Sequence, residues 1–163
     1  MPRFGNESDH TDPQAAQAAA VALLARRDAA SGELRAKLAS KGFEAGAAEA
    51  AVAALEREGL VNDARYAQNY VGYHAGRGQG PVRIAAQLKG LGVPAALIDA
   101  ALDSGPDWGA LAHRVRRSRF GPQPPAEWPE KARQARFLQY RGFSADHIRA
   151  ATGAAPDTGP EGL

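Results

Sequence analysis

The chain has 163 residues, of which 44% are hydrophobic and only 7% aromatic, and it contains no cysteine. The lack of cysteine excludes disulfides and thiolate chemistry, and no apolar run approaches the roughly 20 residues of a membrane-spanning helix. The amino-terminal MPRFGNESDH has no apolar core of the kind found in a secretory signal. We therefore expect a cytoplasmic protein without a membrane partner, and the abundant alanine favours helix.

Charge is distributed unevenly along the chain, although the formal net charge is only +2. Residues 1–62 carry seven basic and nine acidic side chains, a balance of −2, whereas residues 108–151 carry nine basic and three acidic ones, a balance of +6. A positive region of this kind suggests an acidic partner, either a nucleic acid or an acidic protein face. A merely solvated surface is the alternative, and charge alone does not decide between them.

In chain order, the first expected helix covers residues 13–27, after a segment, residues 1–12, that we expect to be flexible. The second helix begins at Ser31, whose side chain is expected to cap it. It ends at Gly42, where the backbone must turn left-handed to leave the helix. A third helix with one apolar stripe follows and ends at Gly59.

Two further groups of helices follow the same plan. Residues 63–75 and 107–119 form their leading helices, and Asp63 is expected to be the N-cap of the first of these. Prolines in the first turn and a capping serine are start signals for the helices that come next. Those helices begin at Pro81, Pro94, Pro129 and Ser144.

Three segments fifty residues apart match without gaps: KLASKGFEAGAAEAA, QLKGLGVPAALIDAA and FLQYRGFSADHIRAA. A fixed period of this kind is the signature of a repeat architecture. We predict an all-α fold of three tandem three-helix repeats that form an elongated, curved array. The repeats cover residues 13–60, 61–104 and 105–152, and residues 153–163 are expected to be a disordered tail.

No motif of an enzyme is present. The four histidines are isolated from one another, and none has the spacing of metal ligands. The glycine-rich GRGQG of residues 76–80 follows a helix and lacks the Gly-Lys-Ser/Thr ending of a phosphate loop, so we interpret it as a hinge. We therefore predict no catalytic activity, no cofactor and no metal.

Two basic segments are the candidate contact surfaces, HRVRRSRF at residues 113–120 and EKARQARFLQYR at residues 130–141. Alternatively, the arginines of the first segment only shield the apolar stripe of Leu111 and Val115 with their stems. Phe137, Leu138 and Tyr140 are expected to be core or edge residues, and core is the favoured interpretation for Phe137 and Leu138. The candidate contacts are Arg77, Arg83, Arg114, Arg116, Arg117, Arg119, Lys131, Arg133, Arg136 and Arg141.

Four segments in this order resemble the RecX family of recombination regulators: LLARRDAASGELRAKLASKGF, GLVNDARYAQNYV, GPVRIAAQLKGLGV and KARQARFLQYRGFSADHIRAA. The likeness covers roughly residues 16–151. It implies three tandem three-helix repeats and a non-enzymatic protein that lies in the groove of the RecA–DNA filament. Members usually inhibit RecA ATPase and strand exchange, in recombination, DNA repair and the SOS response.

The implied partners are the RecA filament and its single-stranded DNA, and we expect a monomer. A stand-alone basic module that binds DNA without RecA is the competing interpretation. It explains the positive carboxy-terminal repeat. A passive scaffold of helical repeats would explain the architecture alone.

Overall fold

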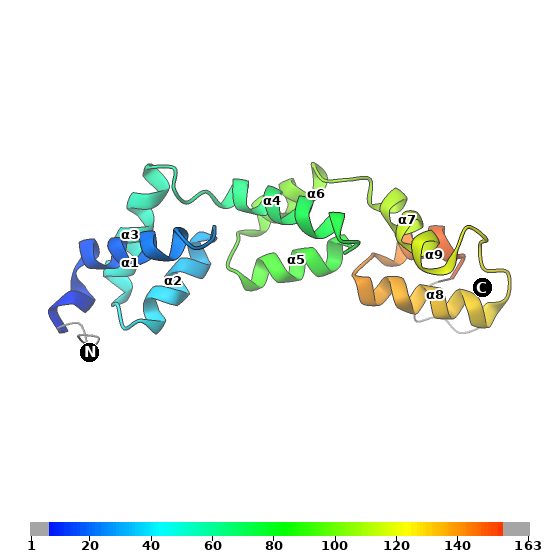
Figure 1. The fold of residues 1–163 in the computed structure, drawn as a ribbon, viewed down its shortest axis with the longest axis horizontal. Helices are drawn as coiled ribbons and strands as arrows, with labels where there is room; N and C mark the ends of the chain where they lie inside the picture. Colours follow the sequence, from blue (N-terminus) through cyan, green and yellow to red (C-terminus); the bar gives the residue numbers. More distant parts are fainter. Residues whose placement is uncertain (1–6, 155–163) are drawn as a thin grey trace. The chain divides into compact units, whose positions relative to one another are not determined.

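The computed structural model describes residues 7–154, which form nine α-helices, one short 3-10 helix and no β-strand (Figure 1). This confirms the predicted all-α fold with three helices in each repeat. In the described part of the chain, no helix combines the length and the hydropathy that crossing a membrane requires. The helices are η1 (Glu7–Thr11), α1 (Pro13–Leu24), α2 (Ser31–Ser40), α3 (Ala45–Arg57), α4 (Asp63–Gly76), α5 (Pro81–Gly90), α6 (Ala95–Asp103), α7 (Trp108–Phe120), α8 (Trp128–Arg141) and α9 (Ala145–Thr152).

Both ends of the described segment contain regular structure or hydrogen bonds. Residues 7–11 lie in the 3-10 helix, although we expected residues 1–12 to be flexible, and the carbonyl of His10 accepts the backbone N–H of Glu44 at 2.8 Å. At the other end, the hydroxyl of Thr152 donates to the carbonyl oxygen of Ala154 at 3.0 Å. The rest of both predicted flexible segments, residues 1–6 and 155–163, lies outside the described residues.

The chain forms two compact units. Within the described residues, the first comprises residues 7–66 and 89–97, and the second comprises residues 67–88 and 98–154. The helices of the middle repeat therefore contribute to both units.

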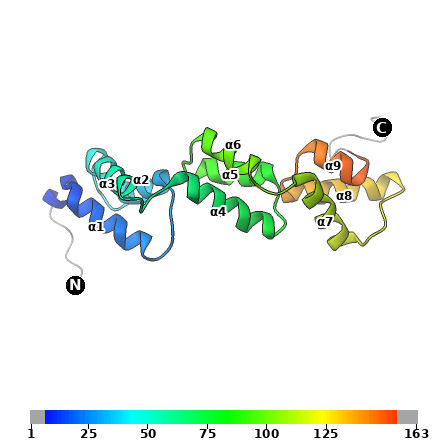
Figure 2. The ribbon, with the colours of Figure 1, turned by 90° about the horizontal axis from the view of Figure 1, so that it is seen from above.

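In the first unit, α1, α2 and α3 pack on one another (Figures 1 and 2). Alanine lets the helices approach closely, and Ala16 and Ala20 of α1 are completely buried. Leu34 and Leu38 of α2 and Leu55 of α3 fill the space between the helices, and none of the three is exposed. The apolar positions that the helical period predicted in this repeat are therefore core positions.

Several helix ends match the predicted signals. Gly42 and Gly142 have φ angles of 95° and 96°, the left-handed conformation that a side chain disfavours. The hydroxyl of Ser144 accepts the backbone N–H of His147 at 3.3 Å and caps α9, as predicted.

Two predicted caps are wrong, because Ser31 and Asp63 bond to each other. The carboxylate of Asp63 accepts the backbone N–H of Ser31 at 2.7 Å and its hydroxyl at 2.5 Å. Ala30 stands at the N-cap of α2 without a side-chain bond. Asn62 caps α4 instead of Asp63, since its side-chain oxygen accepts the backbone N–H of Arg65 at 3.0 Å.

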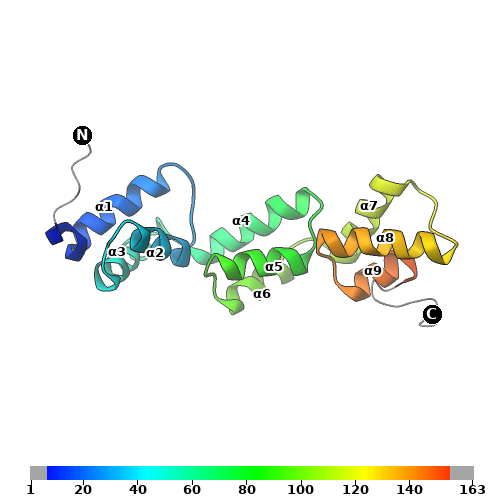
Figure 3. The same cartoon turned by 90° about the horizontal axis from the view of Figure 1, so that it is seen from below.

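In the second unit, α9 packs against α7 and α8 (Figure 3). Leu138 of α8, Phe143 of the turn after it and Ile148 of α9 are buried. The start of α5 is bonded to the turn between α8 and α9, because Val82 donates its backbone N–H to the carbonyl of Gly142 at 2.9 Å. This connection places the end of α4 and the following turn beside α7 and α8.

Candidate functional site

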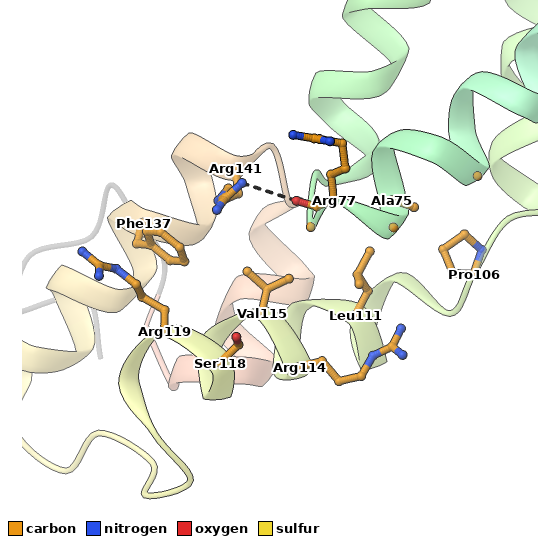
Figure 4. Close-up of a pocket in the computed structure, with 13 residues that line it drawn as sticks. Ala75, Arg77, Pro106, Leu111, Arg114, Val115, Ser118, Arg119, Phe137 and Arg141 are labelled. Atoms are coloured by element: carbon orange, nitrogen blue, oxygen red, sulfur yellow. Dashed lines mark hydrogen bonds between the residues drawn. The ribbon is translucent and has the colours of Figure 1, made fainter.

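A pocket of about 690 Å³ lies in the second unit, between the end of α4 and the helices α7 and α8 (Figure 4). Its wall is partly apolar, and Figure 4 shows Leu111 and Val115 pointing from α7 towards the turn after α4. Phe137 of α8 and Pro106 complete the apolar part. Four of the predicted contact residues also line this pocket, namely Arg77, Arg114, Arg119 and Arg141. We call it the arginine pocket.

Three of these four arginines make cation–π contacts with aromatic rings. The guanidinium carbons of Arg119 and Arg141 lie 5.7 and 5.5 Å from the centre of the Phe137 ring. The guanidinium carbon of Arg77 lies 5.5 Å from the ring of Tyr73. Cation–π contacts of this kind are each worth about 0.5–1 kcal/mol at exposed sites and restrict where the charge lies. Arg141 also donates to the carbonyl oxygen of Arg77 at 3.5 Å, which joins the two sides of the pocket.

No acidic side chain lines the arginine pocket. Within residues 7–154, none of its four arginines forms an ion pair with a carboxylate. Several like charges without a counter-charge produce a positive potential that attracts anions. Because guanidinium groups donate paired N–H bonds to carboxylates and phosphates, these are the anions the pocket suits best.

A second hollow of about 440 Å³ adjoins the arginine pocket along α7. It is lined by Arg114, Arg117, Ser118 and Pro122, so Arg114 and Ser118 belong to both hollows. The structure therefore brings five of the ten predicted contact residues to one continuous surface. They are Arg77, Arg114, Arg117, Arg119 and Arg141.

Arg116 does not belong to this surface, and its prediction as an exposed contact is wrong. Its exposed fraction is only 3%, because the loop after α7 covers it. The guanidinium donates to the carbonyl oxygens of Gly121 and Gln123, at 3.3 and 3.2 Å, and to the side-chain oxygen of Gln134 at 3.3 Å. Arg116 thus ties this loop to α7 and α8.

Arg133 is exposed but has an acidic partner. Its guanidinium donates two hydrogen bonds to the carboxylate of Glu130, at 2.9 and 3.0 Å. These bonds and a further one from Gln134 lower the pKa of Glu130 to about 2. The charge of Arg133 is therefore partly compensated before any partner arrives.

The remaining candidates lie in neither hollow. Arg136 is exposed on α8, whereas Arg83 is half-buried and its Cβ lies against Gly142. Lys131 is also half-buried, and its side chain passes beside Gly153. These three residues are not brought together with the arginine pocket.

Phe137 is the pocket residue whose position differs from the favoured prediction and agrees with the edge alternative. It was expected in the core, but it is half-buried and lines the pocket. One signal was available in the sequence, since Phe137 and Arg141 are four residues apart and therefore share a helix face. No comparable signal links Phe137 to Arg119, which comes from a different helix. In the described residues, no three His, Cys, Asp or Glu side chains gather as a metal site would require.

Comparison with known proteins agrees with this architecture. Models of the first, second and third three-helix domains of RecX match residues 16–55, 62–102 and 109–152. The Regulatory protein RecX of Halorhodospira halophila (strain DSM 244 / SL1) is 45% identical over 150 residues, which cover 91% of this chain and 93% of the relative. That of Stenotrophomonas maltophilia (strain K279a) is 41% identical over 139 residues, 85% of each chain.

A solved structure supports the same fold. The crystal structure of RecX from Lactobacillus salivarius superposes with a TM-score of 0.74 and covers 86% of this chain and 94% of its own. At 21% sequence identity, that likeness concerns the fold alone. The three matching domain models and the close relatives together establish that this chain belongs to the RecX family of regulatory proteins.

Proposed function

We propose that this protein binds the RecA filament on single-stranded DNA and lowers RecA ATPase, strand exchange and co-protease activity. It would act in recombination, DNA repair and the SOS response, as a cytoplasmic monomer. Membership of a family of regulatory proteins supports the proposal. The observation that carries it is the surface of five arginines, three on α7, one at the end of α8 and one after α4, with no acidic residue in either hollow.

This surface matches the chemistry of such a filament. DNA phosphates and acidic protein faces are both anionic, and arginine binds phosphate and carboxylate groups with two parallel hydrogen bonds. Contacts of this kind release counterions, so the affinity falls as salt rises.

Inhibition of RecA requires no bond-making step by the inhibitor. A protein that binds one conformation of the filament more tightly than another shifts the population towards the first by its difference in affinity. If the favoured conformation hydrolyses ATP slowly, the ATPase rate falls. The arginines then act only by binding.

The test is the DNA-dependent ATPase rate of RecA, measured with increasing amounts of the purified full chain. We expect the rate to fall, and the protein to co-sediment with filaments assembled on single-stranded DNA. The protein alone should not hydrolyse ATP. An unchanged RecA rate at saturating protein, without co-sedimentation, contradicts the proposal.

A stand-alone DNA-binding module is the second candidate, because the same arginines suit free DNA. This function predicts equal affinity for a single-stranded oligonucleotide with and without RecA. Titration of a labelled oligonucleotide in both conditions separates the two functions. Tighter binding to the RecA-coated strand supports the first.

A further inference from the structure

The arginine pocket combines two features that a surface for a bare polyanion does not need. One is its apolar wall of Leu111, Val115 and Phe137, and the other is its volume of about 690 Å³. Sites for small organic ligands are largely apolar, with a few polar groups that fix the orientation, and measure about 300–1,000 Å³. We propose that this pocket binds a free nucleoside triphosphate. This proposal goes beyond the function above and does not depend on RecA.

The two parts of a nucleotide match the two parts of the pocket. Guanidinium groups bind phosphate oxygens through paired N–H bonds, and the four arginines supply them without a competing carboxylate in the lining. The flat base can pack on the apolar side chains, and this contact removes apolar surface of both from water. A triphosphate has several adjacent charges and therefore needs more than one arginine. Arg119 and Arg141 are two such arginines, since their guanidinium carbons lie 5.7 and 5.5 Å from the centre of the same Phe137 ring.

Glycines keep the opposite side of the pocket free of side chains. Gly72 and Gly76 of α4 both line it, one helical turn apart. A Cβ atom added at either position would meet no other atom within 4 Å. Glycine in the middle of a helix is less favourable than alanine by roughly 0.5–1 kcal/mol, and at Gly72 no steric contact requires it. Space for a ligand is a physical reason for glycine there.

The proposed event is binding and not hydrolysis. No carboxylate, histidine or lysine lines the arginine pocket, so no side chain there is suited to activate a water molecule. The nucleotide would therefore leave unchanged.

Isothermal titration of the purified full chain, without RecA or DNA, tests the proposal. The probes are ATP, inorganic triphosphate, adenosine and a short thymidine oligonucleotide. We expect ATP to bind at one site per chain, more tightly than triphosphate or adenosine, because only ATP engages both the arginines and the apolar wall. Binding of the oligonucleotide but not of ATP overturns the proposal and assigns the pocket to a DNA strand. Absence of binding by every probe overturns it as well.

Two pairs of variants place the ligand in the pocket. Gly72→Leu adds a side chain to the pocket lining at a position where a Cβ atom meets no other atom within 4 Å, and it should abolish ATP binding. Gly46→Leu, on α3 and equally open at its Cβ, should leave ATP binding unchanged. Arg114→Gln should weaken ATP binding by about tenfold or more. Arg136→Gln removes the same charge from an exposed position outside the pocket and should have little effect.

Circular dichroism shows that each variant is folded. If Gly72→Leu fails to fold, the comparison of Arg114→Gln with Arg136→Gln decides alone. Equal ATP affinity of these two variants contradicts the assignment of the site.

Discussion

The backbone N–H of Gly80 donates to the carbonyl oxygen of Arg141 at 2.8 Å, and the Gly80 Cα lies directly against the backbone of Gly142. A Cβ on Gly80 would overlap the carbonyl group of Gly142. The turn before α5 and the turn after α8 therefore meet backbone to backbone. This contact holds the turn that contains Arg77 beside the end of α8, where Arg141 lies. Arg77 and Arg141 both line the arginine pocket.

We predict that Gly80→Ala destabilises the protein by about 1–3 kcal/mol, because the new methyl group must displace the backbone of Gly142. Gly142→Val should destabilise it by roughly 1 kcal/mol or more, since valine resists the left-handed conformation. Urea denaturation measures both effects. Gly72→Ala is the control and should raise stability by up to about 1 kcal/mol. A Gly80→Ala variant as stable as the wild type would show that this contact is loose.

Arg116→Ala should destabilise the protein by about 2 kcal/mol or more, because it leaves the buried side-chain oxygen of Gln134 without this donor and removes both bonds from Arg116 to the loop carbonyls of Gly121 and Gln123. Its neighbour on α7, Arg117, is exposed, and Arg117→Ala should change stability by no more than about 0.5 kcal/mol. Thermal unfolding of the two variants compares them directly. Equal midpoints would mean that the loop after α7 does not depend on Arg116.

Stability should also depend on pH through Glu33, whose exposed fraction is 7%. Burial raises the pKa of this carboxyl group, but hydrogen bonds and ion pairs with Lys37 and Arg27 outweigh burial and hold the pKa below its ordinary 4.5. Because the pKa is lower in the folded state, the ionised form stabilises the fold above pH 4.5. This contribution is lost as the pH falls through the folded-state pKa.

Glu33→Gln removes this ionisation. The stability difference between wild type and Glu33→Gln should therefore be largest near neutral pH and shrink as the pH falls below 4.5 and through the folded-state pKa. Urea denaturation across this range measures the difference. Glu58→Gln, at an exposed position after α3, serves as the control. A constant difference between wild type and Glu33→Gln at all pH values contradicts the prediction.

Replacement of Arg114, Arg117 and Arg119 by glutamine should weaken binding to DNA or to the filament most strongly at low salt. Each lost phosphate contact lowers the slope of log affinity against log salt concentration by roughly 0.7–0.9. Affinities at several salt concentrations, together with a melting curve, test this. If the arginines only shield the apolar stripe of α7, the triple variant will instead lose thermal stability and keep its salt slope.

The sequence by itself determined the repeat architecture, because the signals that carry it are local. A glycine such as Gly42 or Gly142 ends a helix through its own backbone conformation, and Ser144 caps α9 through a bond to a residue three positions later. The apolar period places Leu34, Leu38 and Leu55 inside for the same reason. Each of these features depends on neighbours within one or two helical turns.

Only the tertiary structure decided which polar side chains are exposed. Arg116 and Arg117 are adjacent on α7, yet the first is buried by the carbonyl groups of the following loop and the second is not. Ser31 and Asp63 were each predicted to cap the start of a helix, but in the structure they form hydrogen bonds to each other. The arginine pocket arises from segments distant in the chain, because its shape depends on how helices pack and not on the pattern within any one of them.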